Sequence, residues 1–210
     1  GPEYLTVFDG RSGAALATAP YVPPRHPTTM TPTSDQLDQL WGDGYGNRVD
    51  RFLAAVGYLD GVRPSLVMAR GYYTRSVLAA WDYRDGALTH RWTFDSDAGD
   101  EANRAYRGQG NHNLSIGDVD GDGRDEILYG AAAIDDDGTG LYSTGLGHGD
   151  AMHFSDLDPD RPGLEVFNIQ ERFDDAGANF RDARTGEVLW RKASVRAGDD
   201  GEGPGRGNSF

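Results

Sequence analysis

Repeated turn units divide this sequence, and they constrain its fold more than any other feature. One unit has Asp and Gly four residues apart with Arg between them, at residues 9–13, 82–86 and 182–186. Each copy lies between two short strand-like runs. Asp and Gly tolerate left-handed backbone conformations, so each copy predicts a strand, a tight turn and a second strand. Helical periodicity is nearly absent, and its best candidate, Arg48 to Leu59, reads equally well as a buried strand. An all-β fold follows.

A second repeated unit is an acidic loop that leads into a strand. It occurs at residues 118–127 and 156–166, with a degenerate copy at 58–67. Asp120 and Asp158 are separated by roughly one four-stranded blade of a β-propeller, about 40–50 residues. Because the two units alternate, we predict a β-propeller of three to four blades over residues 1–210, as a single, partial domain. The Pro-rich stretch 20–46 is either a surface loop or a loop that lines a binding face.

The charge of the chain is strongly acidic and unevenly spread. The formal net charge is −14, which argues against nucleic acid and anionic membranes as partners. Thirteen acidic and two basic residues fall between Asp118 and Glu165, so this window carries −11. Bound hard cations are the simplest way to relieve such a cluster. The absence of cysteine excludes thiol catalysis, disulfides and Cys-based zinc sites. There is no run of 18 apolar residues, and we expect a signal peptide to be absent or already removed.

The acidic loops have the pattern of calcium sites. Carboxylates at every second position of a turning chain converge on one point, and Ca²⁺ takes six to eight oxygen ligands. The alternative is a solvated acidic turn without an ion. The first loop departs from the EF-hand because Tyr129 stands where a bidentate Glu would be needed, so Asp125 or Glu126 is expected to complete the shell. We therefore expect several Ca²⁺ ions, with these loop ligands: Asp118, Asp120, Asp122, Asp125 and Glu126 in the first copy, and Asp156, Asp158, Asp160 and Glu165 in the second.

Two histidines lie in Gly-rich polar segments about one repeat apart. His112 and His148 each precede an acidic loop, and equivalent positions in neighbouring repeats would place both at the same end of the fold. A single such His would more simply be structural, but two at repeat spacing favour a site. His153 is ambiguous, and His26 and His90 are expected at the surface.

Five segments together resemble a known family. They are YGNRVDRFL (45–53), MARGYY (68–73), WTFDS (92–96), GQGNHNLS (108–115) and LYSTGLGHGD (141–150). In this order they closely resemble bacterial rhamnogalacturonan lyases of polysaccharide lyase family 11, over roughly residues 1–195. The resemblance implies an eight-bladed, calcium-rich β-propeller. It also implies cleavage of the galacturonate–rhamnose backbone of rhamnogalacturonan I by β-elimination, usually outside the cell.

The same resemblance implies a set of site residues. It places a Ca²⁺ held partly by His112 and His148 at the active site, where we also expect Asn113 as a ligand, and it matches the catalytic Arg to Arg206. The catalytic Lys of the family comes from a later blade, and Lys192 does not match it. The chain therefore resembles a fragment, for which we expect self-association, whereas a full-length member is expected to be a monomer.

Two classes of function remain open at this point. The first is an extracellular, calcium-dependent rhamnogalacturonan lyase, or a fragment of one that acts on this polysaccharide. The second is a non-catalytic, calcium-stabilised propeller of the integrin-like type that binds carbohydrate or protein. A third hypothesis joins them: lyase ancestry with substrate binding kept and catalysis lost. The roles of Arg48, Asp50, Arg70 and Tyr72 also stay open between sugar contact and pairing within the fold.

Overall fold

A computed structural model describes residues 1–99, 101–171 and 176–194. This part of the chain contains fourteen strands and two short helices. The strands are β1 (Tyr4–Phe8), β2 (Ala15–Pro20), β3 (Phe52–Gly57), β4 (Ser65–Arg70), β5 (Val77–Arg84), β6 (Ala87–Asp95), β7 (Ser115–Gly117), β8 (Glu126–Tyr129), β9 (Ala132–Ile134), β10 (Gly140–Ser143), β11 (Gly149–Ser155), β12 (Glu165–Gln170), β13 (Ala178–Asp182) and β14 (Val188–Lys192); the helices are α1 (Ser34–Trp41) and α2 (Glu101–Arg104). No helix among these residues is long and apolar enough to span a membrane.

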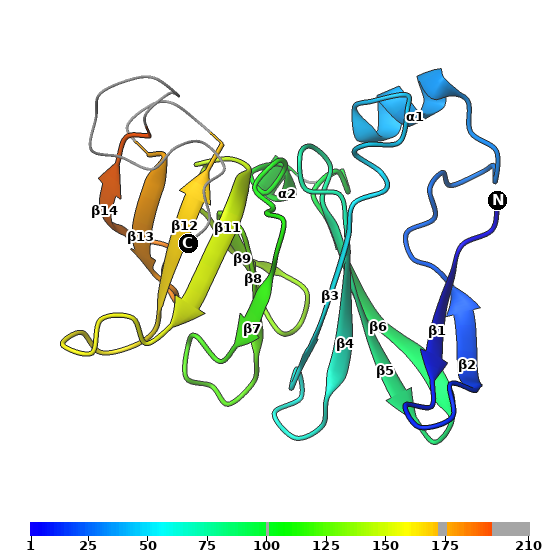
Figure 1. The fold of residues 1–210 in the computed structure, drawn as a ribbon, viewed down its shortest axis with the longest axis horizontal. Helices are drawn as coiled ribbons and strands as arrows, with labels where there is room; N and C mark the ends of the chain where they lie inside the picture. Colours follow the sequence, from blue (N-terminus) through cyan, green and yellow to red (C-terminus); the bar gives the residue numbers. More distant parts are fainter. Residues whose placement is uncertain (100, 172–175, 195–210) are drawn as a thin grey trace.

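The strands form four separate antiparallel sheets. Three sheets have four strands each, β3–β6, β7–β10 and β11–β14, and the fourth consists of β1 and β2 alone. Within every sheet, neighbours in space are neighbours in sequence, as in a meander. The sheets stand in a row in chain order, with β1–β2 at one end and β11–β14 at the other (Figure 1).

The all-β prediction is confirmed, but the prediction of a β-propeller is wrong. None of the four sheets closes, and the first and last lie at opposite ends of the row rather than meeting (Figure 1). The repeat period correctly predicted sheets of four short antiparallel strands. It could not predict how the sheets are arranged, because a local repeat specifies turns and strand pairing but no contact between distant repeats.

The three predicted hairpins are confirmed as β1–β2, β5–β6 and β13–β14. In the first and third, the leading Asp side chain accepts backbone N–H bonds from the turn, as Asp9 does from Arg11 and Ser12. In the second, Asp85 and Gly86 both have positive φ, at 50° and 80°. Two successive left-handed residues match the right-handed twist of the strands, so this turn connects β5 to β6 with only two residues.

The stretch 20–46 is not wholly a loop, because it contains α1. Thr33 and Gln36 form a capping box at its start, and Leu37 and Trp41 are buried on its inner face. Gly42 ends the helix in the left-handed conformation, with φ of 85°. The ambiguous segment 48–59 is not a helix: a turn at 48–50 leads into the strand β3, Phe52–Gly57.

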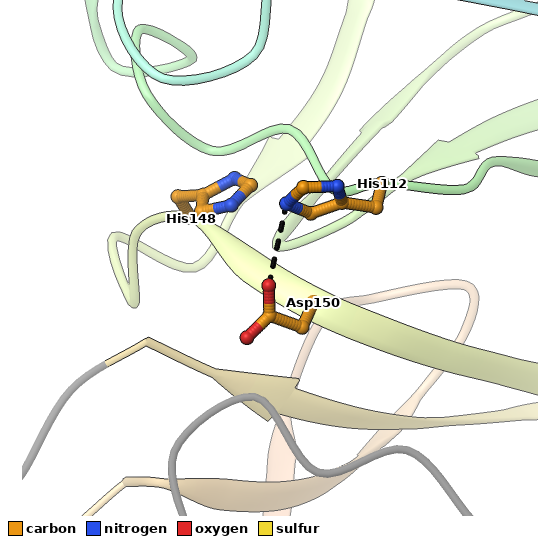
Figure 2. Close-up of side chains that lie close together, drawn as sticks. All are labelled: His112, His148 and Asp150. Carbon is orange, nitrogen blue, oxygen red and sulfur yellow. Dashed lines mark ion pairs between the residues drawn. The ribbon is translucent and has the colours of Figure 1, made fainter.

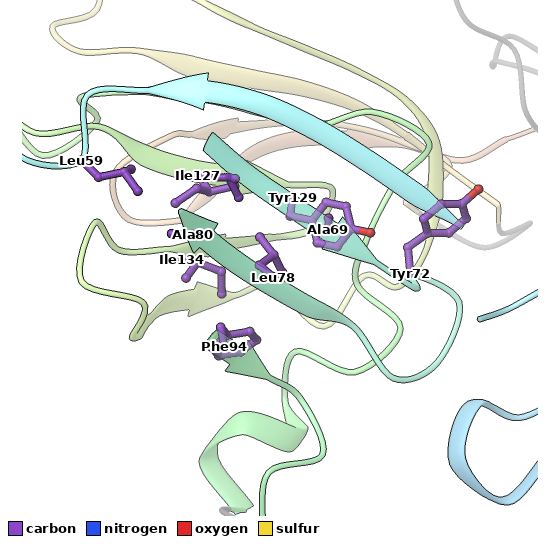
Figure 3. Close-up of a cluster of buried hydrophobic side chains, with 10 residues drawn as sticks. Leu59, Ala69, Tyr72, Leu78, Ala80, Phe94, Ile127, Tyr129 and Ile134 are labelled. Atoms are coloured by element: carbon purple, nitrogen blue, oxygen red, sulfur yellow. The ribbon is translucent and has the colours of Figure 1, made fainter. Parts of the chain in front are cut away.

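Each pair of neighbouring sheets encloses an apolar layer. Ile127 and Leu128 in β8 point to opposite faces, so Ile127 packs against the β3–β6 sheet while Leu128 packs toward the β11–β14 sheet. Figure 3 shows the first of these layers, in which β4 and β5 contribute Ala69, Leu78 and Ala80. Face-to-face burial of such side chains fixes the spacing of the sheets and hence of the loops at their ends.

Arg70 lies inside the protein and has a structural role. It is 0% exposed, and its guanidinium donates to both carboxylate oxygens of Glu3 at 2.7 and 2.8 Å. It also donates to the carbonyl oxygens of Val49 and Pro23. Asp50, the second of the open residues, pairs with Arg25. Both residues therefore tie the N-terminal hairpin and its following loop to β4.

Replacing Arg70 tests this connection. Arg70→Met should lower the free energy of unfolding by about 3 kcal/mol, because it leaves two backbone carbonyls without their donor and Glu3 with Arg25 as its remaining described partner. Urea denaturation measures the change. Arg63→Met is the control, since Arg63 forms an exposed ion pair with Asp60, and its loss should cost less than about 1 kcal/mol. Equal effects of the two substitutions would contradict the structural role of Arg70.

Candidate functional site

Three loops at one end of the sheets bring His112 and His148 together. His112 precedes β7, His148 precedes β11, and the β4–β5 loop supplies Tyr72 and Tyr73. The two imidazole rings are 5.0 Å apart between centroids, and Figure 2 shows them facing each other. The expectation that these histidines lie at the same end of the fold is confirmed.

The hydrogen bonds of His148 determine which of its nitrogens is available. Nδ1 lies 2.7 Å from the carbonyl oxygen of Gly110. A carbonyl only accepts, so Nδ1 carries the proton and Nε2 carries the lone pair. Nε2 is buried and has no hydrogen-bond partner among the described residues. Burial lowers the pKa of His148, which keeps the ring neutral. Nε2 is thus an unused acceptor that points into the site.

Asp150 completes a cluster with the two histidines. Its Oδ1 is 3.3 Å from Nε2 of His112, the contact drawn as a dashed line in Figure 2. Ligand atoms of His112, His148 and Asp150 all lie within 4.8 Å of one another. Sequence reasoning missed Asp150, although it follows His148 by two residues at the start of β11. Two imidazoles and a carboxylate at this spacing can hold a divalent cation.

Tyr72 and Tyr73 form the wall beside the histidines. The Tyr72 ring stacks on His148 at 5.1 Å with an interplanar angle of 8°, and its hydroxyl lies 3.3 Å from Nδ1 of His112. The Tyr73 ring lies 4.3 Å from that of His148. Burial raises the pKa of Tyr72, so its hydroxyl stays protonated. Of the open residues, Tyr72 therefore belongs to the site, whereas Arg48 pairs with Asp43.

The acidic loops lie at the other end of the sheets from the histidines, in the β7–β8 and β11–β12 connections (Figure 1). In the first loop, carboxylate oxygens of Asp118, Asp120 and Asp122 lie within 4.8 Å of one another. Asp125 instead accepts the backbone N–H of Tyr58 at 2.7 Å, across to the β3–β4 loop. Three of the predicted ligands, Asp118, Asp120 and Asp122, thus lie close together. Asp125 forms a hydrogen bond that connects two neighbouring sheets.

Glu126 and Glu165 occupy equivalent positions at the starts of β8 and β12. Both are 0% exposed, and in both one oxygen accepts loop N–H groups, while Oε1 is buried and has no hydrogen-bond partner in the described part of the chain. The second loop is one residue longer than the first between its leading Asp and the glutamate. This extra residue does not change the position of the glutamate at the start of its strand. The carboxylates of Asp156, Asp158 and Asp160 are not gathered as those of the first loop are, within the residues that the structure describes.

The other predicted site residues have separate positions. Asn113 donates from Nδ2 to the carbonyl oxygen of Met152, and its Oδ1 is buried without a partner. His153 is exposed on β11 near Phe167, and His90 is exposed on β6. Arg206 lies outside the described residues.

A second group of carboxylates can carry more negative charge than its paired arginine balances. Glu126, Asp135 and Asp136 bring carboxylate oxygens within 4.8 Å of one another. Burial raises the pKa of Glu126 to about 7, and neighbouring carboxylates add to the rise. Burial likewise raises the pKa of Asp136 to about 6, although Arg124, at 3.0 Å, opposes the shift. Among the described residues, Arg124 thus provides one positive charge to a group that carries three negative charges when all its carboxyls are ionised.

With this geometry established, comparison with known proteins identifies the family. The family model of the rhamnogalacturonan lyase family 11 C-terminal domain matches residues 1–208. This chain belongs to that family. The resemblance predicted from five sequence segments is confirmed, and it extends over nearly all of the 210 residues.

Two curated relatives and two solved structures show how close the likeness is. The chain is 62% identical over 204 residues to rhamnogalacturonan exolyase YesX and 57% identical over 201 residues to rhamnogalacturonan endolyase YesW, both of Bacillus subtilis (strain 168). Each match covers 95% of this chain and 30% of the relative, so the chain spans about three tenths of their length. The crystal structure of exotype rhamnogalacturonan lyase YesX superposes with a TM-score of 0.84 over 92% of this chain and 30% of that one. A rhamnogalacturonan lyase of Bacillus licheniformis, 60% identical, also gives 0.84, over 92% and 31%.

The raised pKa of Glu126 predicts a pH dependence for chelator-treated protein. A carboxyl with a folded-state pKa of about 7 and an ordinary value of 4.5 keeps its proton longer when folded. Its contribution to stability therefore falls as pH rises between these two values. Relative to Glu126→Gln, the wild type should lose stability between pH 5 and pH 7.5 in urea denaturation. Glu187→Gln, at an exposed position, is the control, and parallel pH profiles for wild type and Glu126→Gln would contradict the prediction.

Proposed function

We propose that this chain forms part of a rhamnogalacturonan lyase, in which it supplies a cation-binding face of the active site. The observation that carries the proposal is the cluster of His112, His148 and Asp150, whose ligand atoms lie within 4.8 Å of one another and in which Nε2 of His148 has no hydrogen-bond partner among the described residues. Membership of the family and relatives named as exolyase and endolyase support the reaction class. The substrate proposed is the galacturonate–rhamnose backbone of rhamnogalacturonan I, and the proposed location is outside the cell.

The residues of the cluster fit a divalent cation. His148 offers a neutral, fixed imidazole nitrogen, His112 a second nitrogen, and Asp150 a negative oxygen. When bound, such a cation would neutralise the uronate carboxylate and so make the proton on C5 more acidic. Ca²⁺ is the ion that the family resemblance implies, although two imidazole ligands are unusual for it.

The chain's own side chains would orient the sugar and limit water around it. Tyr72 and Tyr73 pack against the histidines and hold the imidazole planes. Elimination removes the C5 proton while the bond to the leaving oxygen at C4 breaks, so a base is needed near C5. The resemblance assigns the catalytic arginine to Arg206, and we retain Arg206 in that role within the proposal.

We also infer that the acidic loops bind Ca²⁺ for stability rather than for catalysis. Asp118, Asp120 and Asp122 converge on one point, and the unpartnered, buried Oε1 of Glu126 has the chemistry of a missing cation ligand. The loops lie at the far end of the strands from the histidines (Figure 1). Calcium there would relieve repulsion within the fold without touching the substrate.

The rival proposal is a calcium-stabilised binding module without chemistry. Acidic loops alone would suit both proposals. The cluster of His112, His148 and Asp150 favours the lyase, because a module stabilised at its loops has no need of a second cation site at the opposite end.

His148→Gln tests the proposed active site. The substitution removes the free imidazole nitrogen, so the rate of unsaturated uronate formation from rhamnogalacturonan I should fall at least a hundredfold in the protein at its natural length. Absorbance in the ultraviolet measures the product, with and without a chelator. His153→Gln, on the exposed side of β11, is the matched control and should keep activity within twofold. Undiminished activity in His148→Gln, or wild-type protein that binds rhamnogalacturonan I without cleaving it, would overturn the proposal.

If the acidic loops bind calcium, Glu126→Gln should change the stability of the protein in opposite directions without and with calcium. Without calcium the variant should be at least as stable as the wild type at pH 7.5, because an unfavourable buried charge is lost. With calcium it should be less stable, because a ligand is lost. Thermal denaturation with chelator and with excess calcium measures both signs. Equal calcium-dependent gains in Tm for the two proteins would contradict this role of Glu126.

A further inference from the structure

Arg51 lies beside the histidine cluster, at the start of β3, and is not neutralised by a carboxylate within the described part of the chain. Its guanidinium is 5.9 Å from the centroid of the Tyr73 ring, and the same ring lies 4.3 Å from that of His148. A single aromatic ring therefore separates Arg51 from the proposed cation site.

The neighbouring arginines differ from Arg51 in having acidic partners. Arg48 lies over the same Tyr73 ring at 5.0 Å and pairs with Asp43. Arg70 and Arg75 pair with Glu3 and Asp95. The contacts of Arg51 are instead with neutral oxygens, since it donates from Nε to the backbone carbonyl of Asn47 at 2.9 Å and from Nη2 to the side-chain oxygen of the same residue.

These contacts fix the orientation of Arg51 and leave one edge of its guanidinium free. Asn47 occupies the edge formed by Nε and Nη2, and within the described part of the chain the edge formed by the two terminal nitrogens has no further partner. Two parallel N–H groups on that edge match the two oxygens of a carboxylate. Arg51 is half-buried, so such a pair would be less screened by water than one at the surface.

From this arrangement we propose that Arg51 binds the carboxylate of a galacturonate unit that flanks the cleavage position. The inference rests on the proposed function, in which rhamnogalacturonan is the substrate. Its backbone carries a carboxylate on every second sugar, so a unit next to the reacting region always presents one. In a protein of net charge −14, a polyanionic chain needs a fixed local cation to bind. The neutral anchor Asn47 and the Tyr73 ring hold that cation beside the histidines.

Substitution of Arg51 tests the proposal on the protein at its natural length. Arg51→Gln should raise KM for rhamnogalacturonan I about tenfold or more, the loss of one charge-assisted pair, while kcat stays within about twofold. Arg51→Lys should recover part of the affinity, because it restores the charge without the planar fork. Arg48→Gln is the matched control: it removes a guanidinium from the same ring, but one already balanced by Asp43, and KM should change less than twofold.

Calorimetry distinguishes failure of this inference from failure of the proposed function. The probe is a rhamnogalacturonan I oligosaccharide, compared with the same oligosaccharide after reduction of its carboxylates to alcohols. The wild type should bind the acidic form about tenfold more tightly than Arg51→Gln does, and both should bind the reduced form equally. Equal binding of the acidic form by the two proteins, each shown to be folded by urea denaturation, would overturn the role of Arg51 even if the wild type is an active lyase. A difference in binding without any cleavage by the wild type would support Arg51 and overturn the lyase proposal.

Discussion

The face-to-face packing of the sheets is the constraint on which the rest of the structure depends. Strands of only three to nine residues cannot bury both faces unless another sheet covers each one. Ile127 and Leu128, adjacent in sequence, serve two different apolar layers. Because these layers set the spacing between sheets, they also set the spacing between loops at the sheet ends. His112 and His148 precede strands of two different sheets, so their proximity depends on this spacing, and the hydrogen bond from His148 Nδ1 to the carbonyl oxygen of Gly110 adds to it.

The same strands separate two kinds of polar chemistry. One end of the sheets carries the acidic loops, where buried glutamates have an unpartnered oxygen. The other end carries imidazoles, tyrosines and arginines, and most of these arginines are paired with carboxylates. A net charge of −14 for the whole chain therefore describes neither end well. The acidic window found in the sequence lies largely away from the face on which an anionic sugar is proposed to bind.

Sequence reasoning predicted the features that depend on local patterns. The Asp–Gly units gave the hairpins, and equivalent positions in the repeat gave the histidine pair. It did not predict the features that depend on contacts between residues far apart in the sequence. The repeat period could not show that the sheets stand in an open row, and it could not predict that Asp125 accepts the backbone N–H of Tyr58 from the β3–β4 connection. The helix α1 was missed although Thr33 and Gln36 form a readable capping box, because the surrounding prolines suggested a loop. Asp150 and Arg51 were missed because each is identified as a site residue only by its contacts with residues on other loops.

The hydrogen bond between His148 and Gly110 has a consequence for acid–base behaviour at this end of the fold. Since Nδ1 is committed to a backbone carbonyl, a second proton can enter the ring only at Nε2, the atom that faces the cluster. Proton and any electrophile must therefore compete for the same lone pair, and occupancy by one excludes the other. The carbonyl oxygen of Gly110, in the loop before β7, thereby restricts the His148 imidazole to binding either a proton or an electrophile at Nε2. No group in the cluster has to move for this.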